Sequence, residues 1–282
     1  MTMQASDTSM MPMVIAACEQ QRPPQERLLT DPIAVRVLPT AMRTAIRLSA
    51  VRKLLRAGMD RDAPGIWNAI ACRKRYMDEV VAAAIRDGID QIVVLGAGLD
   101  TRALRLAAPA GVRTFEVDLP VSIARKRARV SLPDEVSPVP MDFETMDLKT
   151  VLSQHGFRPD AATLFIWEGV TQYLEEKAVR STLATLADSA SGSRLAFTYV
   201  LRDFLTDPVA PETAGMHRRF VSTGVWRFGL NPAEVAPLLA EFGWREKEQV
   251  GPDEYTTRYL APVRRGHEQV SGIERSASAV KA

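Results

Sequence analysis

The chain has 282 residues, of which 46% are hydrophobic and 25% are charged. This is the composition of an ordinary globular protein, and it excludes a disordered chain, a collagen-like fibre and a coiled coil. Thirty-six Lys and Arg against 34 Asp and Glu leave a formal net charge of +2. Dedicated nucleic-acid-binding proteins carry a larger excess, so we do not expect nucleic acid as a partner.

The cysteine content and the hydrophobic pattern indicate where the protein works. Cys18 and Cys72 are the only cysteines, too few for a disulfide framework. No apolar stretch reaches the length that spans a bilayer, and the first 20 residues hold no Lys or Arg, unlike a signal peptide. We therefore expect a cytoplasmic protein with no membrane association.

Between about residues 89 and 200, short β-rich runs alternate with helical patterns. Strands are predicted at 91–95, 112–118, 136–143, 163–167 and 194–200, and helices near 120–130, 147–154 and 174–189. This alternation is typical of βαβ units and predicts an α/β fold with a mainly parallel sheet. Pro138 and Pro140 cannot donate to a ladder, which favours an edge position for the third strand and the order 3-2-1-4-5.

The rest of the chain is expected to complete one domain, 1–282. Residues 1–86 look mostly helical and are predicted to form a cap, with 87–200 as the core. The segment 201–230 contains several prolines and glycines and is predicted to be a lid insertion after the fifth strand. In 231–282, Asn231, Pro232 and Glu234 form a helix-start signal, and strands are predicted at 244–250 and 273–281.

A glycine-rich turn follows the first predicted strand. Gly96 and Gly98 would let the chain turn tightly and let a ligand approach the backbone. A purely structural turn is an equally good interpretation of this motif alone. Thr101 stands where a full dinucleotide fingerprint has its third glycine.

Acidic residues end the next three strands of the sheet. Asp118 lies 20 residues after Gly98, where a carboxylate can accept hydrogen bonds from a ribose. Asp142, followed by Phe143, ends the third strand, and Glu168 follows the fourth. The carboxyl ends of parallel strands meet at one edge, so these acids would face one crevice. Each alone could instead cap a helix.

Arg73 is predicted to point into the protein. It shares a helix face with Met77, Val80 and Ala84, whereas Arg75 shares one with Glu79. A buried arginine needs an anionic partner, which is either an internal carboxylate or a ligand carboxylate. No metal-ligand spacing, nucleophile elbow or Walker loop occurs, so no metal site is expected.

Four motifs in order resemble the leucine carboxyl methyltransferase-like family of class I S-adenosylmethionine-dependent methyltransferases, in its bacterial branch of small-molecule O-methyltransferases. They are VVLGAGLDTRALRL, FEVDLP, MDF and FIWEGVTQYL, and the resemblance covers about residues 14–281. It implies a Rossmann-like, seven-stranded sheet of order 3-2-1-4-5-7-6 with strand 7 antiparallel.

The resemblance also implies roles for the candidate residues around S-adenosylmethionine. Arg73 would bind the methionine carboxylate, Gly96 and Gly98 would lie under the methionine part, and Asp118 would hold the ribose. Asp142 and Phe143 would flank the adenine, and Glu168 would approach the methionine ammonium. Two positions depart from the family: Ala16 replaces the arginine of an R-A-x-E motif, and Val94 stands where many class I enzymes have an acid.

The expected function is methyl transfer from S-adenosylmethionine to an oxygen of a small-molecule carboxylate or hydroxyl. Tyr173, Tyr199 and His217 are candidates to orient or deprotonate the acceptor, and Arg218, Arg219 and Trp226 are candidates to bind it. The alternatives are a nicotinamide-dependent oxidoreductase and a non-catalytic cofactor-binding protein. The acceptor, the use of a general base and the oligomeric state stay open.

Overall fold

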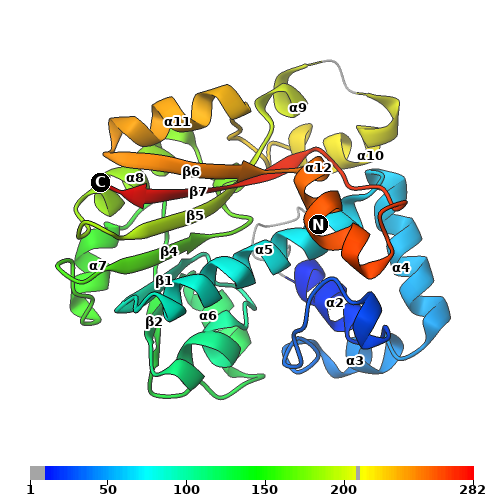
Figure 1. Cartoon of the computed structure of the whole chain (residues 1–282), viewed down its shortest axis with the longest axis horizontal. Coiled ribbons are helices and arrows are strands. Elements are labelled where there is room, and N and C mark those ends of the chain that lie inside the picture. The colour runs from blue at the N-terminus through cyan, green and yellow to red at the C-terminus, as the bar shows by residue number, and fades with distance from the viewer. Residues whose placement is uncertain (1–9, 208–209) are drawn as a thin grey trace.

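The computed structural model describes residues 10–207 and 210–282. Within this part of the chain, seven strands form one sheet of order β3-β2-β1-β4-β5-β7-β6 (Figure 1). The strands are β1 (Gln91–Leu95), β2 (Arg113–Asp118), β3 (Val136–Pro140), β4 (Thr163–Trp167), β5 (Arg194–Val200), β6 (Trp244–Val250) and β7 (Glu274–Lys281). Strands β1 to β5 are parallel, whereas β7 is antiparallel to both β5 and β6. This confirms the predicted fold class and strand order.

Helices and short helical turns connect and cover the strands. The α-helices are α2 (Met10–Glu19), α3 (Thr40–Ala45), α4 (Ser49–Asp62), α5 (Ile66–Arg86), α6 (Pro120–Arg127), α7 (Leu148–Gln154), α8 (Glu176–Ala187), α9 (Arg202–Thr206), α10 (Ala214–Met216), α11 (Pro232–Glu241) and α12 (Pro252–Tyr255). Asn231 and Glu234 form the predicted capping box at the start of α11. The helical stretch at 252–263, which begins with α12, was not predicted.

Proline places β3 at the edge of the sheet, as expected. Pro138 lies opposite Glu116 and Pro140 lies opposite Asp118 in the parallel β2–β3 ladder. A residue without an N–H can be accommodated where only one side of the strand is paired. The position of β3 therefore leaves β1 and β4 in the centre of the sheet.

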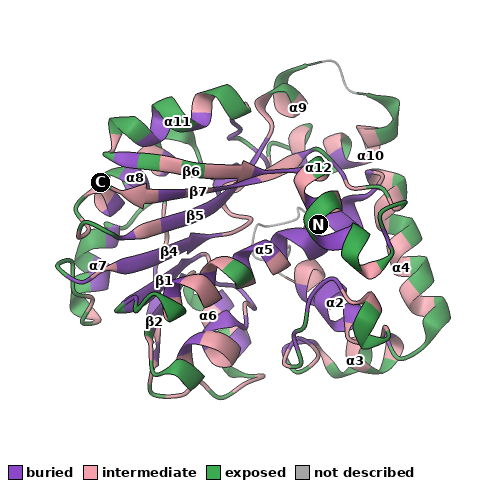
Figure 2. Cartoon of the chain, viewed as in Figure 1, coloured by how far each residue is buried: buried purple, intermediate pink, exposed green. Residues whose placement is uncertain are grey.

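The side chains of the central strands alternate between two hydrophobic clusters. On β1, Ile92 and Val94 belong to a cluster with residues of α2 and α5. Val93 and Leu95 belong to a second cluster with residues of α7, α8 and α11. Figure 2 shows the central strands buried along their length, because helices cover both faces of a mostly parallel sheet. Because both faces of the sheet are covered, a ligand is expected at the carboxyl ends of the strands.

Helix α5 is part of the core as well as of the N-terminal helices. Its residues Met77, Val81 and Ala84 are buried against the sheet face that includes Ile92 and Val94. The predicted boundary between a cap at 1–86 and a core at 87–200 therefore cuts through the packing of one cluster. The 21-residue length of α5 explains this, since it reaches from the cap to the start of β1.

An ion-pair network connects the N-terminal helices with the segment before β7. Glu19 is 1% exposed and accepts hydrogen bonds from the Leu28 backbone N–H at 3.0 Å and from Arg265 Nη1 at 2.9 Å. Arg265 also bonds Glu268, whose pKa is lowered to about 2 by the Arg265 and Arg56 guanidinium groups despite an opposing desolvation effect. Glu19, the acid of the motif in which Ala16 replaces the arginine, thus has a structural partner 246 residues away.

The predicted lid insertion 201–230 contains only short helices in its described part; residues 208 and 209 lie outside it. Val200, Met216, Phe220, Trp226 and Ile273 share a third cluster. The segment therefore packs onto the end of β5 and the start of α5.

No described helix has the length and apolar character needed to cross a membrane, and Cys18 and Cys72 are both buried and free.

Candidate active site

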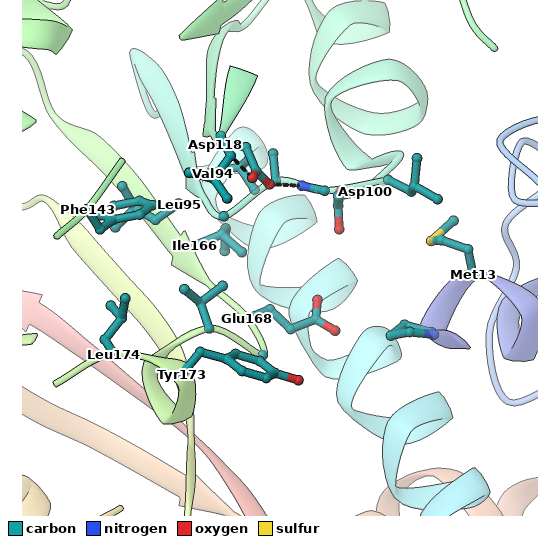
Figure 3. Close-up of a pocket in the computed structure, with 18 of the residues that line it drawn as sticks. Met13, Val94, Leu95, Asp100, Asp118, Phe143, Ile166, Glu168, Tyr173 and Leu174 are labelled. Carbon is teal, nitrogen blue, oxygen red and sulfur yellow. Dashed lines mark hydrogen bonds between the residues drawn. The ribbon is translucent and has the colours of Figure 1, made fainter. Parts of the chain in front are cut away.

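A cavity of about 340 Å³ lies at the carboxyl ends of β1, β2 and β4. Figure 3 shows Asp118 at one end of this cavity and Glu168 with Tyr173 at the other. All seven residues predicted to hold the cofactor line it: Arg73, Gly96, Gly98, Asp118, Asp142, Phe143 and Glu168. The structure therefore brings together residues that are spread over 96 positions of the sequence.

The glycine turn after β1 requires its glycines. Gly96 has φ +69° and Gly98 has φ +47°, in the left-handed region that glycine adopts without strain. A Cβ on Gly96 would lie 2.3 Å from Val170 Cγ2. The turn can therefore approach the loop after β4 only with glycine at this position.

Asp118 ends β2 and holds the glycine turn. Its carboxylate accepts hydrogen bonds from the Gly98 N–H at 2.5 Å and the Leu119 N–H at 2.6 Å (dashed in Figure 3). Burial raises the pKa of Asp118, and these backbone donors oppose the shift. The Ser122 hydroxyl is a third donor to this carboxylate. A carboxylate has about four acceptor positions, so Asp118 retains capacity for a donor from a ligand.

Arg73 connects two buried carboxylates. Its Nε donates to Glu168 at 2.8 Å and its Nη1 donates to Glu274 at 2.8 Å. Its Nη2 lies beside Gly169, where an added Cβ would be 3.4 Å away. The structure therefore supports both interpretations of Arg73, as the partner of an internal carboxylate and as the partner of a ligand carboxylate. Nε and Nη1 pair internally, whereas Nη2 takes no part in these pairs and Arg73 lines the cavity.

Three residues of this charge network were not predicted as site residues. Asp100 and Lys74 line the cavity, and Arg102 lies behind them at 1% exposure. Arg102 pairs with both Asp100 and Glu168, and the arginines hold the pKa of Glu168 below its usual range despite its burial. Asp100 belongs to the G-x-G-L-D run, so its proximity to the glycines was a usable signal. No pattern indicated that Lys74 and Arg102 would be buried.

Val94 stands at the position where many class I enzymes have an acidic residue, and it lines the cavity with an apolar side chain. The charged groups near it come instead from Asp100 and Glu168.

A further buried pair joins Lys126 to Glu116 at 2.6 Å. Lys126 lies between Arg125 and Arg127 in the last turn of α6, so one member of this basic run faces the protein interior.

A second cavity, of about 180 Å³, adjoins the first. Pro12, Arg73, Gly169 and Tyr173 line both cavities. The remaining residues around the second cavity come from α2, α4, α5, the helical turn after β4, the lid segment, α12 and the start of β7. They are Met11, Met59, Asp62, Ile66, Ala69, Ile70, Gln172, Met216, Arg219, Phe220, Trp226, Tyr255, Ile273 and Glu274.

The second cavity contains three of the six residues predicted to contact the acceptor. Tyr173, Arg219 and Trp226 line it, and Trp226 stacks on Phe220 with ring centroids 4.7 Å apart. Arg219 pairs with Asp62 at 3.8 Å. Tyr173 lines both cavities and ends the short helical turn Thr171–Tyr173, which lies in the loop after β4.

Tyr199, His217 and Arg218 do not line either cavity, which corrects the sequence-based expectation. Tyr199 is fully buried in the opposite cluster, donates to Gln249, and has its pKa raised to about 12 by burial. Its position near the end of β5 put it on the face of the sheet that α11 covers. His217 packs edge-on against Phe204, and Arg218 is exposed, because the helical turn 217–221 presents Phe220 inward.

Three cavity residues had no sequence signal. Glu274 starts β7, Gln172 precedes Tyr173, and Tyr255 ends the unpredicted helix α12. Within residues 10–207 and 210–282, no group of three or more His, Cys, Asp or Glu side chains could hold a metal ion.

The family model of leucine carboxyl methyltransferase matches residues 9–187, more than half of the chain. The chain belongs to this family. A relative from Parafrankia sp. is 37% identical over 188 residues, which cover 64% of this chain and 58% of that protein. One from Saccharopolyspora erythraea is 32% identical over 257 residues, covering 84% and 83%. Both are named "putative S-adenosyl-L-methionine-dependent methyltransferase".

Matches to the first three relatives span 53–62% of those proteins' lengths. Among solved structures, a DUF574 family protein from Streptomyces avermitilis is similar with a TM-score of 0.62 and 20% identity, covering 83% of this chain and 91% of that one. A methyltransferase-like structure from Thermobifida fusca has a TM-score of 0.60 and 18% identity, covering 83% and 89%. At these identities the two structures support the fold.

Proposed function

We propose that this protein transfers the methyl group of S-adenosylmethionine to an oxygen atom of a small molecule. The cofactor would bind in the first cavity and the acceptor in the second. The observation that carries the proposal is the convergence of the seven predicted cofactor residues on one cavity, in a chain of the leucine carboxyl methyltransferase family.

The residues around the first cavity fit the parts of S-adenosylmethionine. Asp118 offers a carboxylate to the two ribose hydroxyls, and Asp142 with Phe143 lies at the third strand end for the adenine. Arg73 Nη2 would meet the methionine carboxylate, and Glu168 would attract the ammonium group. When bound, the cofactor supplies an electrophilic methyl group on a sulfonium. The protein's main task is then to align the acceptor oxygen with it.

The same charges disfavour a nicotinamide dinucleotide. Asp100, Asp118 and Glu168 line the first cavity, and a diphosphate there would be close to three carboxylates. Thr101 also replaces the third glycine of the dinucleotide motif. A non-catalytic cofactor-binding protein would not need the second cavity that adjoins the first at Arg73, Gly169 and Tyr173.

Calorimetric titration tests the proposal. We expect S-adenosylmethionine and S-adenosylhomocysteine to bind with one site per chain and NAD to give no saturable heat. A labelled-methyl assay over hydroxyl-bearing and carboxylate-bearing small molecules should then show transfer that depends on the protein. Saturable NAD binding without S-adenosylmethionine binding would overturn the proposal.

A further inference from the structure

The second cavity has a size and lining suited to a single aromatic ring. Its volume is about 180 Å³, and an apolar protein cavity of about 150 Å³ accommodates benzene. Met11, Met59 and Met216 line it together with the stacked Phe220–Trp226 pair. Thioether sulfur and ring edges both make favourable contacts with aromatic rings.

The charged groups of the second cavity are already compensated. Arg219 pairs with Asp62 at 3.8 Å, and Arg73 pairs with both Glu274 and Glu168 at 2.8 Å. In the second cavity, a ligand carboxylate would find Arg219 paired with Asp62, and the remaining amino group of Arg73 is the one assigned above to the methionine carboxylate. It would also lie near the carboxylates of Asp62 and Glu274. An additional unpaired anion in such a site is unfavourable.

Two residues that line the cavity each carry a buried polar atom, which a hydroxyl group would reach after rotation of that side chain. Gln172 Oε1 and Trp226 Nε1 have no hydrogen-bond partner among residues 10–207 and 210–282. The amide oxygen can only accept and the indole N–H can only donate. A hydroxyl can both donate and accept, whereas an ionised carboxylate can only accept. Buried groups left unpaired are unusual and are often explained by a missing ligand or water.

Glu274 is the best-placed proton acceptor for such a hydroxyl. It lines the second cavity with its side chain 14% exposed, and both its oxygens accept hydrogen bonds from Arg73 Nη1. Burial raises the pKa of Glu274, and Arg73 only partly offsets this. A raised carboxyl pKa makes a stronger base near neutral pH. Of the other described lining groups, Asp62 is 37% exposed, and the Tyr255 hydroxyl bonds Ser276.

We infer that the acceptor is a monocyclic phenol and that Glu274 takes its hydroxyl proton. This rests on the function proposed above and narrows it. The phenol oxygen forms a bond to the methyl carbon as the carbon–sulfur bond breaks, and the sulfur keeps that electron pair. The phenolic proton passes to the Glu274 carboxylate and later to water. The products are a methyl aryl ether and S-adenosylhomocysteine.

A matched ligand series tests the inference on protein saturated with S-adenosylhomocysteine. Binding of 4-methylphenol, 4-methylbenzoate and toluene is measured by ligand-observed NMR. We expect 4-methylphenol to bind at least about tenfold tighter than 4-methylbenzoate and tighter than toluene. Equal or tighter binding of 4-methylbenzoate would contradict the charge argument. Absence of binding by all three would overturn the ring-sized site, while the bound S-adenosylhomocysteine would still support the cofactor site.

Glu274→Gln tests the proton acceptor. With labelled S-adenosylmethionine, we expect kcat for 4-methylphenol to fall about 100-fold or more, with the dissociation constant of 4-methylphenol changed less than about threefold. In the unaltered protein kcat/KM should fall as the pH drops through the raised pKa of Glu274, and this dependence should disappear in the variant. The matched control is Glu248→Gln, which removes a carboxylate paired with Arg258 at 2.8 Å on β6, outside both cavities. An unchanged rate in Glu274→Gln, or no methylation of 4-methylphenol, would contradict the inference.

Discussion

Replacing Asp118 by alanine is expected to weaken S-adenosylmethionine binding by about 1–3 kcal/mol, which is roughly a 5- to 150-fold rise in dissociation constant. The substitution removes the carboxylate that would bind the ribose hydroxyls. It also removes the acceptor of the hydrogen bonds that the Gly98 and Leu119 N–H groups donate in the structure. Calorimetry with S-adenosylmethionine measures the effect.

Two further variants separate these contributions. Asp118→Asn keeps one carbonyl oxygen for the glycine turn and should bind the cofactor with intermediate affinity. Asp160→Ala removes an exposed aspartate after α7 and should leave affinity unchanged. If Asp118→Ala binds S-adenosylmethionine with normal affinity, the ribose assignment is wrong.

Replacing Arg73 by alanine is expected to lower the free energy of unfolding by about 3–5 kcal/mol and to weaken cofactor binding. Arg73 is 7% exposed and is the ion-pair partner of Glu274. Its loss would leave that buried carboxylate unpaired, whereas Glu168 would keep Arg102. Urea unfolding monitored by circular dichroism measures the stability change.

Arg75→Ala is the matched control on the same helix. Arg75 pairs with the half-exposed Glu79 at 3.1 Å, and such a pair contributes below about 1 kcal/mol. Adding Glu274→Gln to Arg73→Ala should restore part of the lost stability because the unpaired charge is removed. An Arg73→Ala protein that is destabilised but binds S-adenosylmethionine normally would show that Arg73 serves only as an internal ion-pair partner.

The sheet and the first cavity were predictable because both depend on local patterns. Buried strands appear as short apolar runs, Pro138 and Pro140 mark the edge, and strand-end acids follow each run. Since parallel strands align their carboxyl ends, Asp118, Asp142 and Glu168 had to meet there. The position of β7 came from the family resemblance, not from the spacing of residues.

The second cavity was harder to predict because its wall depends on long-range packing. Glu274 and Tyr255 come from parts of the chain about 200 residues away from Arg73, and no motif connects them. Tyr199 was assigned from its position at the end of the fifth strand and His217 from its place in the predicted lid. The face that each side chain occupies is set by packing in the folded protein. Phe220 and Trp226 face inward, whereas Arg218 faces solvent.

A crystal structure with S-adenosylhomocysteine tests the central claim most directly. The account predicts the ribose hydroxyls within about 3.2 Å of the Asp118 carboxylate, the adenine beside Asp142 and Phe143, and the amino-acid end at Arg73 and Glu168. The second cavity should stay open toward the sulfur. A ligand bound outside the first cavity, or one with its adenine among Phe220 and Trp226, would contradict the account.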